Sequence, residues 1–199
     1  MPLTRYSRVG TNLTQLFFWE DFIGDTYDNT IWNCGGSGGS ASIQEGSILH
    51  IMANGDNYYQ LEQTDITSAA SFVTCNYRCR LSSKNGIKVQ VGLMAGNWTE
   101  WTVILYDSRI NANFWCQSVF NSVASEVDSG IAADTSFHEF RIEMSPGGIR
   151  YYIDGIYVTT ISTNNPTALL KLYAYAAAIT GSSKSLFVDS IKATCNLEA

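Results

Sequence analysis

The chain has 199 residues, of which 45% are hydrophobic and only 15% charged, and its formal net charge is −6. A chain of this length and apolar content buries a sizeable core and is not a disordered segment. It has 12 basic and 18 acidic residues and no basic run. Phosphate-backbone binding needs clustered lysine and arginine, so we do not expect nucleic acid as a partner.

The first residues are polar, and we expect residues 1–15 to form an N-terminal arm and residues 16–199 to form one domain. The nearest apolar run, residues 16–19, is too short for a signal peptide or a membrane span. The sequence therefore predicts neither export by the general secretory route nor a membrane partner.

Five cysteines are present, none in a C-x-x-C pair, and only two histidines accompany them, so a zinc site is not expected. Cys75 and Cys79 share one face of a predicted strand. They lie roughly 13 Å apart at about 3.3 Å per residue, which is too far for a disulfide. We expect the cysteines, which are Cys34, Cys75, Cys79, Cys116 and Cys195, to be buried thiols in a reducing compartment.

Along the chain the hydrophobic pattern has a period of two. Residues 73–81 and 138–144 alternate apolar and polar side chains, as half-buried antiparallel strands do. His138 falls on the apolar side of its strand, which favours a core histidine over a catalytic base. Residues 168–178 have helical composition, but their alternation favours a strand with Tyr173 and Tyr175 on one face.

Turn signals separate these runs, and Asp154-Gly155 marks a tight hairpin. The spacing predicts about 13 strands and hence an all-β, two-sheet antiparallel sandwich. The other predicted breaks are residues 35–39, 54–57, 84–86, 146–148 and 180–183.

The stretch from Phe137 to Gly155 resembles the strand–turn–strand hairpin of concanavalin A-like lectin/glucanase domains. Laminarinase-type glucanases and laminin-G modules belong to this group. Residues 19–32, 43–51 and 185–194 are similar to its opening strand, next hairpin and closing strand. The resemblance spans about residues 17–195 and implies a jelly-roll fold, which by itself hosts many functions.

A second resemblance concerns residues 25–32 (DTYDNTIW), 128–138 (DSGIAADTSFH) and 164–168 (NNPTA). These segments are similar to segments of jelly-roll domains in tailed-phage virion proteins, including capsid decoration and fibre-associated modules.

Glycoside hydrolysis requires two carboxylates that flank a cleft. Glucanases of the resembled family present them as Glu-x-Asp-x-x-Glu on one strand face. Glu126-Val127-Asp128 is the comparable run here, but Ile131 takes the place of the third acid and the run lies late in the chain. We therefore interpret these acids as a solvated strand edge and expect no catalytic residue.

Aromatic residues beside amides are the candidates for ligand contact. Sugar C–H faces stack on aromatic rings, and amide side chains bind hydroxyl groups. The candidates for a glycan or a protein partner are Tyr58, Tyr59, Trp98, Trp101 and Trp115. The alternative is that these rings belong to the core or to a protein interface.

The resemblance also implies one structural calcium ion, because laminarinase-type domains tie their opening strand to their closing strand with a cation. The matching positions are Glu20, Gly46 and Asp189. No dense cluster of Asp and Asn supports this site independently.

Together these observations favour a non-enzymatic virion module, a capsid decoration (cement) or fibre-associated protein. It would bind the major capsid protein or another virion protein, assemble in the host cytoplasm and form a homo-oligomer, with a trimer favoured. The alternative is a carbohydrate-binding, lectin-like domain that recognises cell-surface polysaccharide. A glycoside hydrolase with a degenerate acid motif is the third hypothesis.

Overall fold

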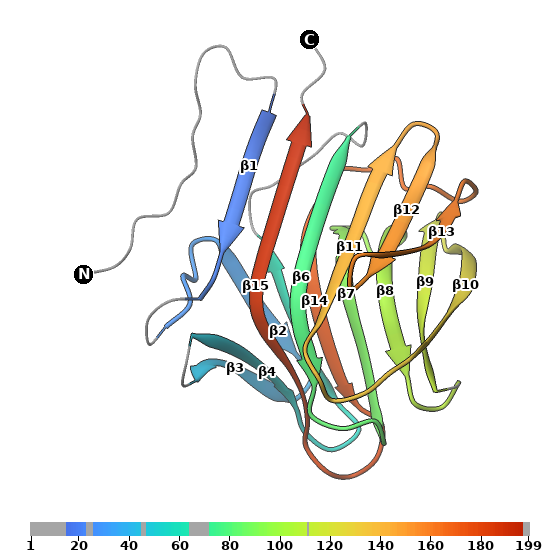
Figure 1. Cartoon of the computed structure of the whole chain (residues 1–199). Helices are drawn as coiled ribbons and strands as arrows, with labels where there is room; N and C mark the ends of the chain where they lie inside the picture. Colours follow the sequence, from blue (N-terminus) through green and yellow to red (C-terminus); the bar gives the residue numbers. More distant parts are fainter. Residues whose placement is uncertain (1–14, 23–25, 45–46, 64–71, 111, 197–199) are drawn as a thin grey trace.

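The computed structural model describes residues 15–22, 26–44, 47–63, 72–110 and 112–196. These residues form fifteen strands in two sheets that pack face to face (Figure 1). Every strand pair is antiparallel. The expected antiparallel β-sandwich is confirmed. Among the described residues no helix is long and apolar enough to cross a membrane.

Seven strands of the eight-stranded sheet lie side by side in one continuous order, and the eighth, β1 (Gln15–Glu20), pairs with β15 outside that order. Its spatial order is β13 (Ile156–Ile161), β12 (Gly148–Ile153), β11 (His138–Ser145), β6 (Val73–Leu81), β15 (Lys184–Asn196), β4 (Ile48–Ala53) and β3 (Gly39–Gln44).

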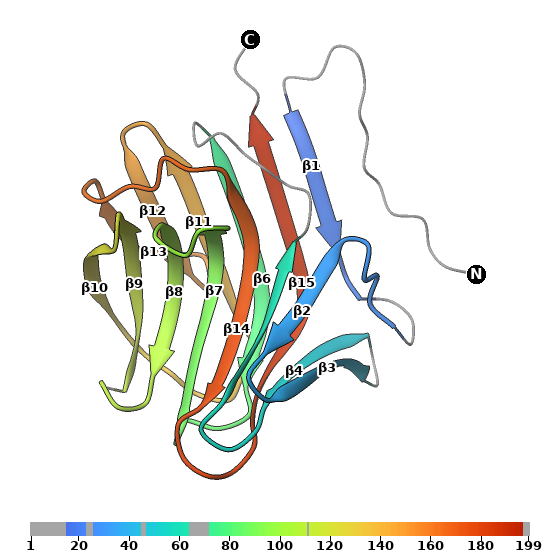
Figure 2. The ribbon, with the colours of Figure 1, turned by 180° about the vertical axis from the view of Figure 1, so that it is seen from behind.

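The seven-stranded sheet forms the other layer, which lies in front in Figure 2. Its order is β10 (Val123–Ala132), β9 (Asn113–Phe120), β8 (Trp101–Asp107), β7 (Ile87–Ala95), β14 (Leu170–Ala178), β5 (Tyr58–Gln63) and β2 (Trp32–Gly36). The segment with helical composition is thus β14, a central strand, because its alternation buries one face against the core.

The main core lies between the two sheets and follows the alternation of the strands. Cys75, Cys79 and Cys116 are buried in it, Cys34 is half-buried, and all four are free thiols. Burial raises the pKa of Cys75 and of Cys116 to about 12. A thiol that stays protonated is a poor nucleophile, so these cysteines act as small apolar core residues.

The glycine-rich segment at residues 35–39 is not the continuous break that its composition predicts. Gly36 ends β2 and Gly39 begins β3, so the connection is much shorter. A Cβ atom at Gly36 would clash with the Tyr58 carbonyl, and one at Gly39 would clash with the Met52 carbonyl. Glycine is present here because neighbouring backbone approaches closely, which is a second reason for glycine in strands.

Two tyrosines of the eight-stranded sheet cross the core and bind the backbone of the other sheet. The Tyr77 hydroxyl donates to the Gly92 carbonyl at 2.6 Å and accepts from the Tyr173 amide at 3.1 Å. Tyr151 donates to the carbonyl of Gln117 at 2.9 Å. These bonds fix β7, β14 and β9 from the core side and thereby hold the outward-facing residues of these strands in place.

Candidate functional site

The outer face of the seven-stranded sheet gathers four of the five predicted ligand-contact residues. Alternation along β9 turns Phe114 and Cys116 into the core and leaves Trp115 and Gln117 on the outer face. The strand registers align the residues of this face in two neighbouring rows, which we call the inner row and the outer row. The inner row is Asn33, Glu62, Tyr173, Gly92, Val103, Gln117 and Glu126; the outer row is Gly35, Gln60, Tyr175, Gln90, Leu105, Trp115 and Asp128.

Large side chains cover the middle of this face and form a second, smaller hydrophobic cluster. Val103 is 0% exposed and Tyr173 is 1% exposed, although both lie on the outer side of the sheet. Trp101, Trp115 and Tyr175 pack against them. The face is therefore an apolar aromatic platform rather than the solvated surface that an outward strand face usually presents.

The rings continue along β14 to both ends of the platform. Trp98, 46% exposed in the β7–β8 turn, has a left-handed φ of 60° and packs edge-on to Tyr173 at 6.1 Å. At the other end Tyr58 is 39% exposed and stacks on Tyr175 at 5.7 Å, while Tyr175 stacks on Tyr173 at 6.1 Å. Four rings thus form a line with an accessible ring at each end.

Tyr59 is the exception among the predicted contact residues. It packs against the main core, because adjacent residues of a strand point to opposite faces and Tyr58 points outward. The prediction that Tyr58 and Tyr59 serve one ligand site is wrong for Tyr59.

A chain of hydrogen bonds leads from the platform to a carboxylate at its edge. Trp101 Nε1 donates to Gln117 Oε1 at 2.5 Å, and Gln117 Nε2 donates to Glu126 Oε1. Asp128, two residues further along β10, accepts from Asn113 Nδ2 at 3.0 Å. The rows of the sheet therefore end in two exposed carboxylates beside Trp115 and Gln117.

The position of the missing third acid is buried. Ile131 packs against the main core, and the register of β10 shifts between Asp128 and Ala132. Gly130 adopts φ 68° at this irregularity, and its amide donates to Asp128 Oδ1 at 2.8 Å. The run therefore has no third acid on this face, and its two solvated acids lie at the end of an aromatic platform.

Two polar atoms of the outer row are buried and have no hydrogen-bond partner among the described residues: Gln60 Oε1 and Trp115 Nε1. The other end of the Gln60 amide donates to Glu62 Oε1 at 2.6 Å. Burial raises the pKa of Glu62, while Lys171 opposes this shift. The two atoms lie four strands apart in this row, so each could pair with a different hydroxyl group, which can both donate and accept.

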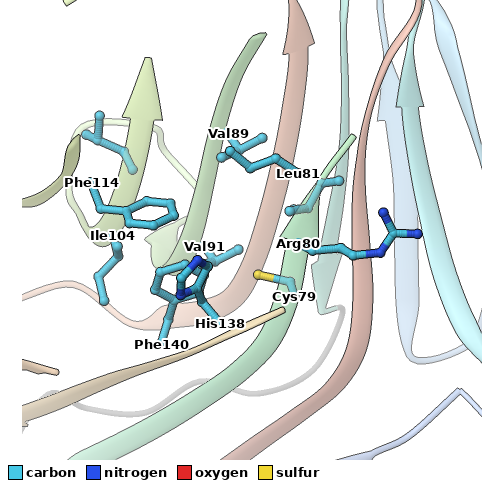
Figure 3. Close-up of a pocket in the computed structure, with 11 residues that line it drawn as sticks. Cys79, Arg80, Leu81, Val89, Val91, Ile104, Phe114, His138 and Phe140 are labelled. Atoms are coloured by element: carbon cyan, nitrogen blue, oxygen red, sulfur yellow. The ribbon is translucent and has the colours of Figure 1, made fainter. Parts of the chain in front are cut away.

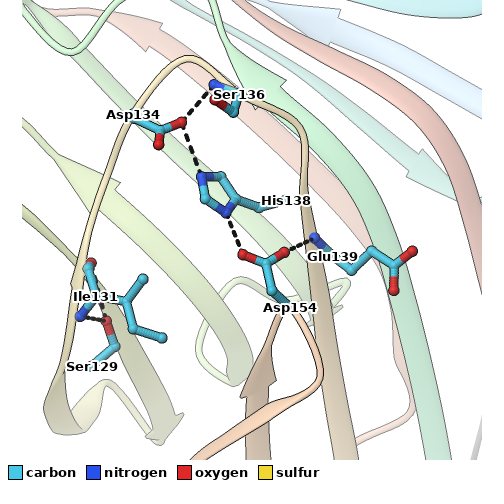
Figure 4. Close-up of polar contacts among 7 residues, drawn as sticks. All are labelled: Ser129, Ile131, Asp134, Ser136, His138, Glu139 and Asp154. Atoms are coloured by element: carbon cyan, nitrogen blue, oxygen red, sulfur yellow. Dashed lines mark hydrogen bonds and ion pairs between the residues drawn. The ribbon is translucent and has the colours of Figure 1, made fainter.

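His138 is held in the core by contacts with two aspartates. His138 is 8% exposed, and its ring nitrogens face Asp154 at 2.7 Å and Asp134 at 3.1 Å (Figure 4). It lines a core cavity of about 10 Å³ whose other walls are largely apolar (Figure 3). The prediction of a core histidine with satisfied hydrogen bonds is confirmed, and this cavity is too small for a substrate.

Two of the three residues of the predicted calcium site, Glu20 and Asp189, lie in the described part of the chain, and both make other polar contacts. Both Glu20 oxygens accept hydrogen bonds, from the Phe22 amide at 3.0 Å and from Trp32 Nε1 at 3.5 Å. Asp189 pairs with Arg78 at 2.6 Å, and Gly46 lies outside the described residues. Within the described ranges no group of three or more His, Cys, Asp or Glu side chains is arranged to hold a metal. Calcium binding stays a prediction, and thermal unfolding with and without a chelator tests it.

No protein-family model matches the chain, and no curated protein matches its sequence. Solved structures do share its fold. An endo-acting O-glycanase of the human gut microbiota superposes with a TM-score of 0.74 at 11% identity, over 91% of this chain and 99% of that one. The Bacillus licheniformis β-glucanase superposes with a TM-score of 0.70 at 14% identity, over 88% and 96%. A Mycobacterium tuberculosis protein described as a pseudo β-1,3-glucanase gives a TM-score of 0.70 at 12% identity, over 88% and 97%.

The chain has a concanavalin A-like jelly-roll fold. The expected fold class is confirmed by these superpositions. The expectation of a non-enzymatic virion module is wrong, because the solved structures that share the fold include an O-glycanase and a β-glucanase. The prediction that the chain is not an enzyme is corrected for the same reason. It rested on one missing acid, whereas glycoside hydrolases share this fold.

Sequence reasoning did not identify Gln117, Glu62 or the two tyrosines of β14 as parts of the site. The shared face of Tyr173 and Tyr175 followed from alternation, but their position beside Gln60 and Gln90 depends on pairing between distant segments. The available signal was that Tyr173 and Tyr175 alternate with buried leucine and alanine, so that rings stand where an outward strand face usually carries polar residues.

Proposed function

We propose that the chain is a polysaccharide hydrolase that binds its substrate along the outer face of the seven-stranded sheet. The observation that supports this most directly is the alignment of aromatic rings, amides and carboxylates in two neighbouring rows. Seven strands at about 4.8 Å spacing give each row a length of roughly 29 Å. That length accommodates several sugar units of a chain molecule, which suits endo-acting cleavage.

The aromatic rings and the polar side chains would contact different parts of a sugar unit. Aromatic rings offer flat apolar surface to the C–H faces of pyranose rings, and Trp98 and Tyr58 are exposed enough to do so. The unpaired atoms of Gln60 and Trp115 lie beneath this surface and would bind hydroxyl groups after a small side-chain shift. A buried polar atom without a partner costs about 1–3 kcal/mol, so a ligand hydroxyl that pairs with it contributes to affinity.

Glu126 and Asp128 are the proposed catalytic pair. Residues two apart on a strand point to the same face with Cα atoms roughly 6.6 Å apart. Retaining and inverting glycosidases hold their carboxyl groups about 5–5.5 Å and about 6.5–9.5 Å apart. Side chains that leave one strand on the same face from Cα atoms of this spacing can bring their carboxyl groups into that range, as general acid and base catalysis requires. Glu126 is bonded through one oxygen to Gln117 and leaves the other to donate a proton to the glycosidic oxygen. Asp128 would activate the attacking water or face the anomeric carbon.

Reducing-end release from laminarin, lichenan and mucin O-glycans tests this proposal. Wild-type chain should cleave one of these polymers, and Glu126→Gln or Asp128→Asn should lower kcat by at least about 100-fold, the smaller end of general acid–base contributions. Both variants should still bind the polymer in affinity electrophoresis. Glu139→Gln, on an exposed residue of the eight-stranded sheet, is the matched control and should keep full activity.

Activity that survives both substitutions would show that the two acids are not the catalytic pair. Absence of cleavage on all three polymers, with binding retained, would refute hydrolysis while leaving the binding face in place.

A further inference from the structure

The outer face of the eight-stranded sheet carries a stack of rings and guanidinium groups, remote from the platform. Arg80 of β6 lies over the Phe187 ring at 4.1 Å and near the Phe137 ring at 5.4 Å, and Arg78 lies over that second ring at 4.6 Å. His50 stacks on the other side of Phe187 at 4.8 Å with an interplanar angle of 8°. The register explains this order, because Arg80 pairs with Phe187 and Phe187 pairs with His50 across the sheet.

Arg80 points away from the protein interior. Its neighbours Cys79 and Leu81 are buried, and Figure 3 shows its side chain directed away from the core cavity that they line. In the part of the chain that the structure describes, Arg80 makes no ion pair, whereas Arg78 pairs with Asp189 at 2.6 Å and Arg141 lies 3.5 Å from Glu143. Among the acids that the structure describes, none pairs with Arg80 as Asp189 does with Arg78.

The two faces of the sandwich differ in charge. Of the ten described lysines and arginines, five point outward from the eight-stranded sheet, together with three carboxylates. The strands of the seven-stranded sheet present the opposite excess on their outer face, with Lys88 and Lys171 against four carboxylates, one of which, Asp107, pairs with Arg109 of the following turn. In a chain of net charge −6, the positive charge is thus concentrated on the face that bears the stack. Those five cations are Arg78, Arg80, Arg141, Arg150 and Lys192.

The chemistry of the stack selects its ligand. A guanidinium group with a ring on its flat side keeps its N–H donors free at the edge, where they match the two oxygens of a carboxylate or sulfate group. Phe137 and Phe187 add apolar surface beside that edge, which is complementary to the C–H face of a sugar ring. His50 does not compete for the anion, because burial and the nearby Arg80 lower its pKa.

We propose that Arg80, Phe137 and Phe187 form an accessory site for an acidic sugar, a uronate or sulfated residue of a polysaccharide. The class of ligand rests on the proposed function, but the site itself is separate from Glu126 and Asp128. It would hold an acidic stretch of the polymer on one face of the sandwich while the platform contacts a neutral stretch.

Affinity electrophoresis of the full chain tests the site with polygalacturonate, dextran sulfate and neutral dextran. Wild-type protein should be retarded by one of the acidic polymers and not by dextran, and retardation by one acidic polymer alone identifies carboxylate or sulfate as the ligand group. Arg80→Gln should weaken binding about tenfold or more, as expected for a charge-assisted bidentate contact. Arg80→Lys should restore only part of it. Arg150→Gln, on the same face but outside the stack, should reduce binding less than threefold.

Equal retardation by neutral and acidic polymers would overturn the proposal, and so would wild-type binding by Arg80→Gln. Binding of a single-stranded oligonucleotide that depends on Arg80, without binding of acidic polymers, would assign the stack to a different ligand class. Glu126→Gln should leave binding of the acidic polymer unchanged, and Arg80→Gln should leave cleavage of a short neutral glucan unchanged. The two proposals can therefore fail independently.

Discussion

Trp101 and Gln117 are joined across β8 and β9 by a hydrogen bond of 2.5 Å from the indole nitrogen to the amide oxygen. This bond fixes which end of the amide faces β10, because the oxygen is already engaged. The Gln117 Nε2 group is then directed to Glu126. An aromatic residue of the platform thus positions a proposed catalytic carboxylate through one intermediate side chain.

Replacing Gln117 with leucine should lower kcat on the cleaved polymer about tenfold and leave KM nearly unchanged. The substitution keeps the size of the side chain but removes the hydrogen bond that orients Glu126, and a hydrogen bond to a charged group contributes about 1.5–3 kcal/mol. Steady-state kinetics measures both constants. Gln44→Leu on the edge strand of the opposite sheet is the control, and an unchanged kcat in Gln117→Leu would show that Glu126 needs no such support.

Tyr77→Phe should destabilise the fold by about 1–3 kcal/mol for each backbone group that loses its partner. The hydroxyl is buried and binds both the Gly92 carbonyl and the Tyr173 amide, so its removal leaves an acceptor and a donor unpaired between the sheets. Urea unfolding measures the change in free energy.

Tyr152→Phe is the matched control for Tyr77→Phe. Tyr152 lies partly exposed on the outer side of the neighbouring strands, and its hydroxyl donates to Glu143 at 3.1 Å, where water replaces the lost bond. Equal destabilisation by the two substitutions would mean that the crossing hydroxyl of Tyr77 has no special weight.

The local alternation of apolar and polar residues was enough to predict the strands, but not the two rows of residues on the outer face of the seven-stranded sheet. Alternation in residues 73–81 and 138–144 and the turn at Asp154-Gly155 are properties of neighbouring residues, and each prediction agrees with the structure. The alignment of Gln60 with Tyr175 and of Leu105 with Trp115 depends on register between strands, which is set by long-range packing.

The glycan-contact residues show the same division. A sequence does not show which face of a strand packs against the other sheet, so it could not predict that Trp98 and Tyr58 are exposed. Tyr59 was grouped with Tyr58, its neighbour in the chain, although the two side chains point to opposite faces of β5. The position compared for the third acid, Ile131, lies within a register shift of β10 that a sequence does not reveal.

Tyr58→Ala should weaken binding of the cleaved polymer about three- to tenfold, since an aromatic contact contributes about 0.5–1.5 kcal/mol beyond its buried area. Tyr58 is the exposed end of the ring line on the proposed binding face. Quenching of tryptophan fluorescence reports binding, because Trp98 and Trp101 belong to the same face.

Tyr157→Ala serves as the control for Tyr58→Ala. Tyr157 is 54% exposed, more than Tyr58, but it lies on β13 at the edge of the other sheet. If both substitutions reduce binding equally, general surface hydrophobicity rather than the platform accounts for the affinity.

Asp134, beside His138, makes the fold sensitive to acid. Hydrogen bonds from Ser136 and from the ring of His138 lower the pKa of Asp134 below its ordinary value of 3.8. A carboxyl group whose pKa is lower in the folded state stabilises the fold above its unfolded pKa and loses that contribution as the pH falls through its folded pKa. Asp134→Asn should therefore lower Tm at neutral pH and make Tm fall less steeply below pH 3.8.

Thermal unfolding of wild type and Asp134→Asn from pH 7 to pH 2 measures this difference. Asp56→Asn, an exposed aspartate of the β4–β5 turn, is the control for loss of one negative charge and should run parallel to wild type. Parallel curves for wild type and Asp134→Asn would show that Asp134 does not couple the fold to pH.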